Sequence, residues 1–240
     1  MITIKKYFNF TLSGRRFFNL IFSALCIFLS LYGCNLQEFP PDISKGFNCS
    51  QTFLDARDGN TYKTVWIDED GGHDINKPGN CWFAENLKFD TNDFHSRCYD
   101  DNNGNCSEFG RMYVDATTGV NVLNIVPPNG WHVATKDEWI ELLEEIYGFV
   151  PTHTSIGIRY SGVTKVLLDG GSSGLNFKLG GRCDNDACTQ ISEVITLWAP
   201  EGYHCTIPKD SESSRIDLFI NATMGEQVYR EYYVRCIQDK

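Results

Sequence analysis

The sequence has 240 residues, of which 42% are hydrophobic, and a formal net charge of −10 at neutral pH. This length is enough for one domain with a sizeable core. An acidic surface repels phosphate backbones and anionic lipid head groups, which argues against nucleic acid as a partner.

Residues 1–33 have the pattern of a lipoprotein signal peptide. The apolar run Phe17–Tyr32 is shorter than the roughly 20 residues that a transmembrane helix needs, and polar residues interrupt it. Leu31–Cys34 resembles a lipobox, so we predict cleavage before Cys34 and lipid attachment to its sulfur. An ordinary cleaved signal peptide is the alternative.

Removal of this signal takes away four basic residues and leaves 17 Lys and Arg against 31 Asp and Glu, a formal charge of −14. Asn35, rather than an aspartate, follows the cysteine and favours the outer membrane in bacteria that use that sorting rule. We therefore expect an exported protein, anchored at the outer membrane or cell surface, that reaches the membrane through its lipid.

The lipidated Cys34 and a short tether occupy residues 34–48, and the domain extends over 49–240. Its first element is a predicted β-hairpin with a tight turn at Asp58-Gly59, between arms at 52–57 and 60–67. A polar loop follows at 68–79.

The clearest helix begins at Thr135, which forms a capping box with Glu138. Apolar residues then recur with helical spacing on one face, at Trp139, Leu142, Leu143 and Ile146. The segment 148–203 is glycine-rich with little periodicity, so we expect a long irregular loop region there. Alternating residues predict strands at 216–220 and at 232–236, with Tyr232, Val234 and Cys236 on the inner face of the last strand.

Cysteine usage agrees with export, because eight cysteines follow the lipid site and an even number in an exported chain indicates disulfides. Proximity favours Cys98–Cys106 and Cys183–Cys188. Cys49 and Cys81 flank the hairpin and could join its ends. Elimination then pairs Cys205 with Cys236.

Several segments together resemble one family. They are TFLDARDGNTYKTVWI (52–67), CWFAENLKF (81–89), CYDDNNGNCSEFGRMY (98–113), GWHVATKDEW (130–139), YYVRCIQDK (232–240) and, more weakly, GLNFKLGGR (174–182). In this order they resemble the Fibrobacter succinogenes major paralogous domain, a family of secreted and lipid-anchored bacterial proteins. The resemblance implies an α+β fold related to C-type lectins and formylglycine-generating enzymes, with about two helices, long irregular loops and a buried Asn86. It implies no particular activity.

No cofactor is expected, and calcium is the alternative. The acidic and amide residues of 100–105 offer oxygen ligands, but their spacing differs from an EF-hand loop and no Glu closes it. The acidic residues of 68–74 fail in the same way. The histidines are scattered, which argues against zinc.

Cys183 and Cys188 follow the pair Gly180-Gly181, and this interval resembles the catalytic cysteine pair of the copper-dependent formylglycine-generating enzymes. Asp184 and Asp186 stand between the two cysteines and would raise their thiol pKa values, which disfavours a reactive dithiol. A structural disulfide is the prediction. The sequence shows no other arrangement typical of catalysis, so we expect no catalytic residues.

If the domain has a ligand-binding face, lectin-like folds place it in the irregular loops. The candidate residues there are Asp184, Asn185, Asp186, Trp198, Glu201 and Tyr203. The run LWAPEGYH (197–204) departs from the family pattern, which has small hydroxyl residues in place of Ala-Pro-Glu. For Trp198 a core position is the alternative.

Three functions follow from these observations. The leading hypothesis is a surface binding module for a glycan, a polysaccharide or a protein partner. The alternative is a structural or assembly component of the cell envelope that binds no small ligand. The third, more remote, is a cysteine oxidase of the formylglycine-generating type.

Overall fold

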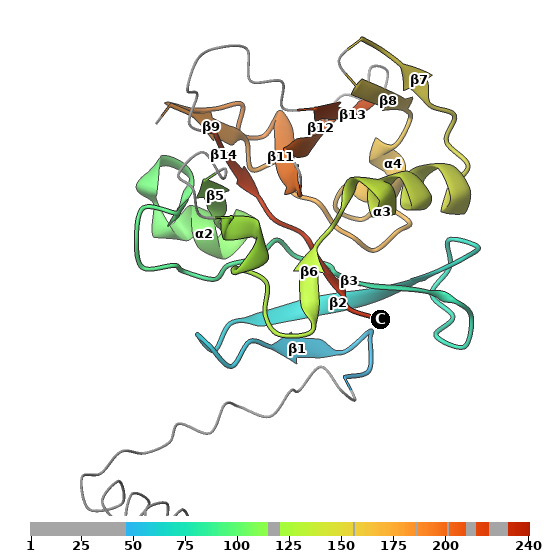
Figure 1. Cartoon of the computed structure of the whole chain (residues 1–240), viewed down its shortest axis with the longest axis horizontal. Helices are drawn as coiled ribbons and strands as arrows, with labels where there is room; N and C mark the ends of the chain where they lie inside the picture. The colour runs from blue at the N-terminus through green and yellow to red at the C-terminus, as the bar shows by residue number, and fades with distance from the viewer. Residues whose placement is uncertain are drawn as a thin grey trace, which may run out of the picture. The chain divides into compact units, whose positions relative to one another are not determined.

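The computed structural model describes residues 47–114, 121–155, 157–185, 187–200, 202–209, 215–220 and 230–240, with the backbone alone at 215–220. All of them belong to one compact unit, Asp42–Lys240. The predicted signal peptide, Cys34 and most of the tether lie outside these ranges. The described residues form a mixed α+β structure that is mostly sheet, with few helices (Figure 1).

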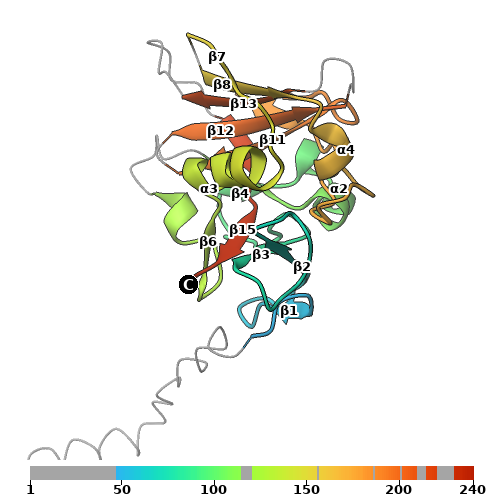
Figure 2. The ribbon, with the colours of Figure 1, turned by 90° about the vertical axis from the view of Figure 1, so that its right-hand side faces the viewer.

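The first sheet joins the beginning of the described chain to its end. Its strand order is β1-β2-β3-β15-β6, and every pairing is antiparallel. The strands are β1 (Thr52–Leu54), β2 (Thr61–Asp68), β3 (Gly79–Phe83), β6 (Trp131–Val133) and β15 (Cys236–Gln238). The last strand, β15, therefore lies between two strands from earlier parts of the chain (Figures 1 and 2).

The second sheet has the order β10-β9-β14-β11-β12-β13-β8-β7, and β5 attaches to β14 and to β4. Its strands are β4 (Ser96–Arg97), β5 (Met112–Val114), β7 (Thr152–His153), β8 (Gly157–Ser161), β9 (Arg182–Asp184), β10 (Ala187–Thr189), β11 (Val194–Ala199), β12 (Tyr203–Pro208), β13 (Arg215–Ile220) and β14 (Arg230–Tyr233). The contact of β11 with β14 is parallel. The predicted strand at 216–220 is confirmed as β13.

The helical segments are short. They are η1 (Tyr99–Asp101), α2 (Asn103–Phe109), η3 (Val122–Asn124), α3 (Lys136–Ile140), η4 (Glu141–Ile146) and α4 (Thr164–Leu167). Helix α3 contributes Trp139 to the core, with its ring 5.3 Å from that of Trp82 and 5.8 Å from that of Phe177. Because Trp82 lies in β3, this contact connects the helix to the first sheet.

The capping box predicted at the start of α3 is confirmed, since Thr135 and Glu138 exchange hydrogen bonds. Trp139, Leu142 and Leu143 are buried as predicted. The second half of this helix, η4, widens into a π-helix, and the N–H of Tyr147 donates to the carbonyl of Leu142, five residues earlier. Hydrophobic spacing does not distinguish an α from a π turn, so the sequence gave no sign of this widening.

The predicted tight turn of the first hairpin is wrong, because strand β1 ends at Leu54 and a six-residue loop follows. The Asp55 carboxylate is buried and pairs with the Arg57 guanidinium at 2.7 Å. Arg57 also donates to the carbonyls of Val126 and Pro127 at 2.8 and 3.1 Å. These bonds hold the loop on a distant segment, and a two-residue turn could not form them.

The expectation of an irregular region over 148–203 is also wrong in large part. This segment contributes strands β7 to β11 and helix α4. All six residues of the central strand β11 are buried, so its sequence shows no alternation of polar and apolar residues. Periodicity alone could not identify such a strand.

Three predicted disulfides are present among the described residues: Cys49–Cys81, Cys98–Cys106 and Cys183–Cys188. The fourth pairing is wrong. Cys205 and Cys236 lie in different hydrophobic clusters and form no disulfide with each other. Burial raises the pKa of the Cys236 thiol, so this group stays protonated at neutral pH.

The end of the chain crosses from one sheet to the other, whereas the sequence predicted a single last strand. Strand β14 lies in the second sheet, and β15 lies in the first (Figure 1). Tyr232, Val234 and Cys236 are buried on one side, as predicted, in a cluster with Trp131. Tyr233 and Ile237 enter the other cluster. The crossing segment therefore packs against both cores.

Arg235 lies in this crossing segment and is 1% exposed. One terminal nitrogen donates to the carbonyls of Phe83 and Leu175 at 2.8 and 2.7 Å, and the other donates to Oδ1 of Asn86 at 2.8 Å. The guanidinium carbon lies 4.0 Å from the centre of the Phe177 ring. Burial lowers the pKa of Arg235 to about 9, so the group remains charged at neutral pH.

His132 connects β6, helix α3 and the chain end. Its Nδ1 is 2.7 Å from a carboxylate oxygen of Asp239, and its Nε2 is 2.8 Å from one of Glu138. The hydrogen bond with Glu138, and that with Asp239, raise the pKa of His132 against the effect of burial. Burial alone would raise the pKa of Glu138, but hydrogen bonds from His132 and Thr135 lower it.

We predict that Arg235→Met destabilises the protein by about 3 kcal/mol, because it leaves three buried oxygens without their donor. Denaturant unfolding of the full chain in mild detergent measures this change. Lys165→Met, a change of the exposed lysine of helix α4, is the control and should change the stability by less than about 0.5 kcal/mol. Equal stability of the two variants would contradict the role given to Arg235.

A second prediction concerns pH. The raised pKa of His132 gives stability that is present below its unfolded value of 6.5 and is lost as pH rises through the folded value. The lowered pKa of Glu138 gives stability that is present above 4.5 and is lost as pH falls through the folded value. Between these limits both contributions are present. His132→Gln should therefore cost more stability at about pH 5.5 than at about pH 8.5. An identical loss at both pH values would refute this.

Candidate functional site

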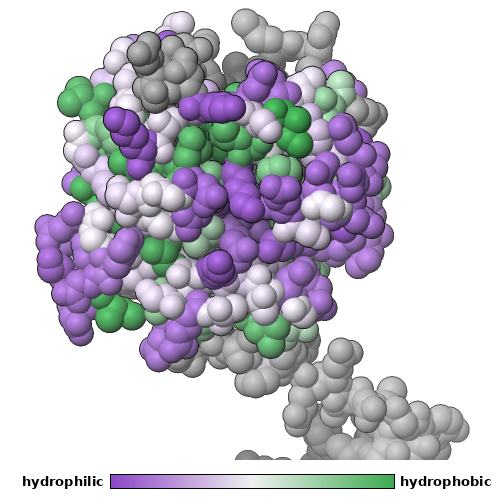
Figure 3. Space-filling view, turned by 180° about the vertical axis from the view of Figure 1, so that it is seen from behind, coloured by the Kyte–Doolittle hydropathy of each residue, from purple (hydrophilic) through white to green (hydrophobic). Residues whose placement is uncertain are grey.

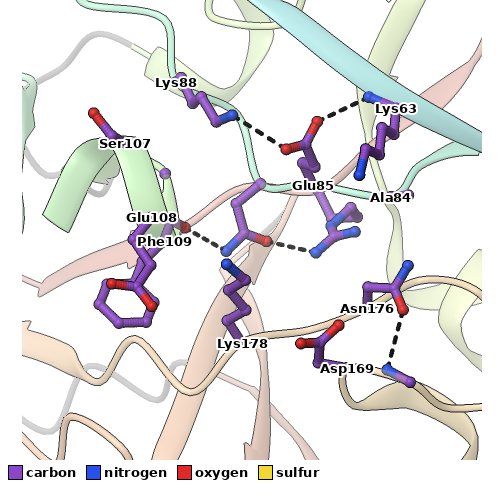
Figure 4. Close-up of a pocket in the computed structure, with 14 residues that line it drawn as sticks. Lys63, Ala84, Glu85, Lys88, Ser107, Glu108, Phe109, Asp169, Asn176 and Lys178 are labelled. Atoms are coloured by element: carbon purple, nitrogen blue, oxygen red, sulfur yellow. Dashed lines mark hydrogen bonds and ion pairs between the residues drawn. The ribbon is translucent and has the colours of Figure 1, made fainter. Parts of the chain in front are cut away.

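A polar cavity of about 270 Å³ opens between the two sheets' connecting segments, and Arg235 forms part of its wall (Figure 4). Its lining comes from β2, from the segment after β3, from the end of α2 and from residues 169–178. A second hollow of about 510 Å³ shares Phe109 and Lys178 with it. The two hollows therefore lie side by side, and we call them together the polar groove.

The α2 side of the polar groove is held by local contacts. The Cys98–Cys106 disulfide and the N-cap of Asn102, whose side chain accepts from the N–H of Gly104 at 2.9 Å, fix this short helix. Asn86 donates from Nδ2 to the carbonyl of Phe109 at 2.7 Å. Phe109 is thereby held at the wall beside the buried Asn86, whose burial the family resemblance implied.

The opposite side is a loop held by Asn176. Its Oδ1 accepts from the N–H of Gly170 at 3.2 Å, and its Nδ2 donates to the carbonyl of Gly174 at 2.8 Å. The neighbouring Phe177 is buried in the core. This arrangement leaves Asp169 and Lys178 at the groove, where Figure 4 shows both side chains directed toward its interior.

Glu85 lies at the upper rim in Figure 4, and both of its oxygens are engaged. One accepts from the backbone N–H of Lys63 at 2.8 Å, and the other lies 3.3 Å from the ammonium of Lys88. Burial works to raise the pKa of Glu85, but these two neighbours hold it below its usual value. Glu85 is therefore an ionised, already paired carboxylate.

Other charged groups of the groove remain available. Within the described ranges, the side chains of Glu108, Asp169 and Lys178 form no hydrogen bond or ion pair with a described residue. All three are exposed. A carboxylate accepts hydrogen bonds and an ammonium donates them, so the groove presents both functions beside the Phe109 ring.

Trp198 does not provide an exposed platform, so this part of the predicted ligand face is wrong. It is 1% exposed, its Nε1 donates to the carbonyl of Tyr113 at 2.7 Å, and its ring lies 4.5 Å from that of Tyr232. The physical reason is that both faces of β11 are covered, and Trp198 packs in the hydrophobic cluster that contains Tyr113 and Tyr232. The core alternative for Trp198 is confirmed.

The other described residues of the predicted face, Asp184, Asn185 and Tyr203, do not line the polar groove. Asp184 accepts from the Tyr232 hydroxyl at 3.1 Å and pairs with Arg182 at 3.3 Å. Asn185 follows it in the β9–β10 hairpin. Strands β14 and β11 separate this hairpin from Tyr203, whose ring lies 4.8 Å from the Lys136 ammonium. Asp186 and Glu201 lie outside the described residues.

The carboxylate of Asp68, at the start of the acidic loop after β2, is occupied by hydrogen bonds within that loop. Asp68 accepts from the backbone N–H groups of Asp70, Gly72 and Asp74 at 2.9 to 3.0 Å, and these bonds, that from Asp74 foremost, lower its pKa. No group of three or more metal-ligating side chains comes together in the part of the chain that the structure describes. No described helix has the length and apolar character needed to cross a membrane.

The polar groove could not be identified from the sequence, because its charged residues come from segments far apart in the chain. Glu85 and Lys178 lie in segments that resemble the family, but neither they nor Asp169 form a pattern that indicates a binding site. Two local signals marked its walls, namely the expected burial of Asn86 and the loop closed by Cys98–Cys106. Figure 3 shows one face of the molecule, on which hydrophilic residues predominate and smaller hydrophobic groups lie among them.

Comparisons of this chain with protein-family models, with curated proteins and with solved structures found no match.

We predict different costs for two glycines at the groove that both have positive φ. A Cβ at Gly110 would lie 2.7 Å from Cβ of Asn86, whereas a Cβ at Gly170 would meet nothing within 4 Å. Gly170→Ala should cost about 1 kcal/mol from backbone strain. Gly110→Ala should cost about 3 kcal/mol, because overpacking adds to the strain. Thermal or denaturant unfolding of both variants checks this, and equal costs would contradict the close approach at Gly110.

Proposed function

We propose that this protein is exported, anchored by lipid at the cell surface, and binds a glycan in the polar groove. The contacts of the groove carry the proposal. Sugar hydroxyls act as donor and acceptor at once, and here the carboxylates of Asp169 and Glu108 and the ammonium of Lys178 line the same groove. The Phe109 ring offers an apolar surface beside them, of the kind that packs on a sugar ring.

Export is supported by disulfides. Bonds such as Cys49–Cys81, the longest in sequence separation at 32 residues among those described, persist in oxidising compartments and are rare in the cytosol. The signal peptide and lipobox predicted in the first 34 residues agree with this. Anchoring at the outer membrane or cell surface through Cys34 is part of the proposal.

Membership of the Fibrobacter succinogenes major paralogous domain family, with its C-type lectin-like fold, is also proposed. Its support is the run of matching segments in the sequence. The mixed α+β architecture, the buried Asn86 and the predicted disulfides agree with it. Much of the segment 148–203 is more regular than the resemblance implies.

An envelope-assembly role is the second candidate. Its support is the bracing of the domain by disulfides and by the buried Arg235, which a rigid structural module requires as much as a binding module does. The two functions differ in whether the polar groove takes a ligand.

The test is retention of the full chain, in mild detergent, on a panel of immobilised polysaccharides and glycans with and without calcium. Saturable retention that Asp169→Asn weakens about tenfold, through loss of a charge-assisted hydrogen bond, is the expected result. Asp58→Asn, an exposed change in the first hairpin, is the matched control and should leave retention unchanged. The proposal fails if no glycan retains the chain, and the envelope-assembly role then becomes the leading one.

A further inference from the structure

We propose that the polar groove selects acidic glycans, with a sugar carboxylate bound on its cationic side by Lys178 and Lys63 and backed by Arg235. This inference rests on the proposed glycan-binding function and adds the chemical class of the ligand. It follows from one buried cation, from two ammonium groups near it and from the charges that line the groove.

The first observation is that Arg235 has no acidic partner among the described residues. Its hydrogen bonds all reach uncharged oxygens, two carbonyls and the amide of Asn86. Its buried Nε has no hydrogen-bond partner in the described part of the structure. Because the hydrogen-bond acceptors around this buried guanidinium are all neutral, an anion in the adjoining cavity would lower its free energy.

Glu85 does not fill this role. It acts on Arg235 through space and works to raise its pKa. Its carboxylate is already shared between the backbone N–H of Lys63 and the ammonium of Lys88. The cavity wall therefore carries a positive charge that its nearest acid compensates only in part.

The second observation concerns the two lysines. Lys63 extends from β2 and Lys178 from the loop on the opposite side, so their side chains flank the opening in Figure 4. Neither ammonium forms a hydrogen bond or ion pair within the described ranges. A carboxylate that enters between them can pair with an ammonium at the rim while it lies in the field of Arg235.

The charged residues that line the cavity determine which kind of anion can bind there. Four basic and three acidic residues line the cavity, which gives it a local excess of one positive charge in a chain of net charge −10. The basic residues are Lys63, Lys88, Lys178 and Arg235, and the acidic ones are Glu85, Glu108 and Asp169. The two available carboxylates accept hydrogen bonds from hydroxyl groups and repel a second anionic group. This favours a single carboxylate on a hydroxyl-rich ligand, such as a uronate residue, over a sulfated or phosphorylated polymer.

The test measures the affinity of the full chain, in mild detergent, for an oligosaccharide that carries a single uronate residue and for the same oligosaccharide after reduction of its carboxyl to a neutral hydroxymethyl group. Calorimetry at physiological salt should give about tenfold tighter binding of the acid form. Lys63→Gln should weaken the acid form about fivefold and leave the neutral form unchanged. Lys165→Gln, an equally exposed change away from the groove, should alter neither.

Equal affinity for the acid and neutral forms, or tighter binding of the neutral form, would overturn this inference and leave the glycan-binding function in place. Binding of neither form would overturn both. Loss of affinity for both forms in Lys63→Gln would also overturn it, because the lysine would then act on the hydroxyls and not on the carboxylate.

Discussion

Arg235 places a positive charge at the junction of two sheets, and its hydrogen bonds reach two parts of the chain that are distant in sequence, the segment 83–86 and Leu175. Phe83, Asn86 and Leu175 stand 152, 149 and 60 residues away from it. A buried guanidinium is costly unless its donors are satisfied, so these segments must converge around it. This requirement fixes the end of the chain between the two hydrophobic clusters.

The polar groove is a consequence of the same requirement. The segment after β3 supplies Glu85 and Asn86, and the loop after α4 supplies Asp169 and Lys178, because both segments must pass close to the guanidinium. The groove therefore lies beside the buried guanidinium, at the place where its surroundings satisfy the charge least completely. In the proposed function, Arg235 serves both stability and ligand binding, and the exposed groups around it would change the ligand preference without changing the core.

Local chemistry in the sequence predicted the local structure well. The capping box of Thr135 and Glu138, the buried stripe after it and the disulfide Cys98–Cys106 all depend on residues close in the chain. What the sequence could not predict depends on distant contacts. Strand β11 lacks alternation because it is buried on both faces, and the pairing of Cys205 with Cys236 failed because elimination carries no information about the two clusters. No motif predicts the groove itself, because its charged residues come from segments that are not adjacent in sequence.

The most direct test of the link between the buried charge and the ligand is an NMR titration of the Arg235 Nε–Hε resonance in the full chain, assigned by comparison with Arg235→Lys. Addition of a uronate oligosaccharide should shift this resonance, because the carboxylate lies in the field of the guanidinium, and the carboxyl-reduced oligosaccharide should leave it nearly unchanged. A uronate that binds and shifts other groups, while the Arg235 resonance stays in place, would contradict the account.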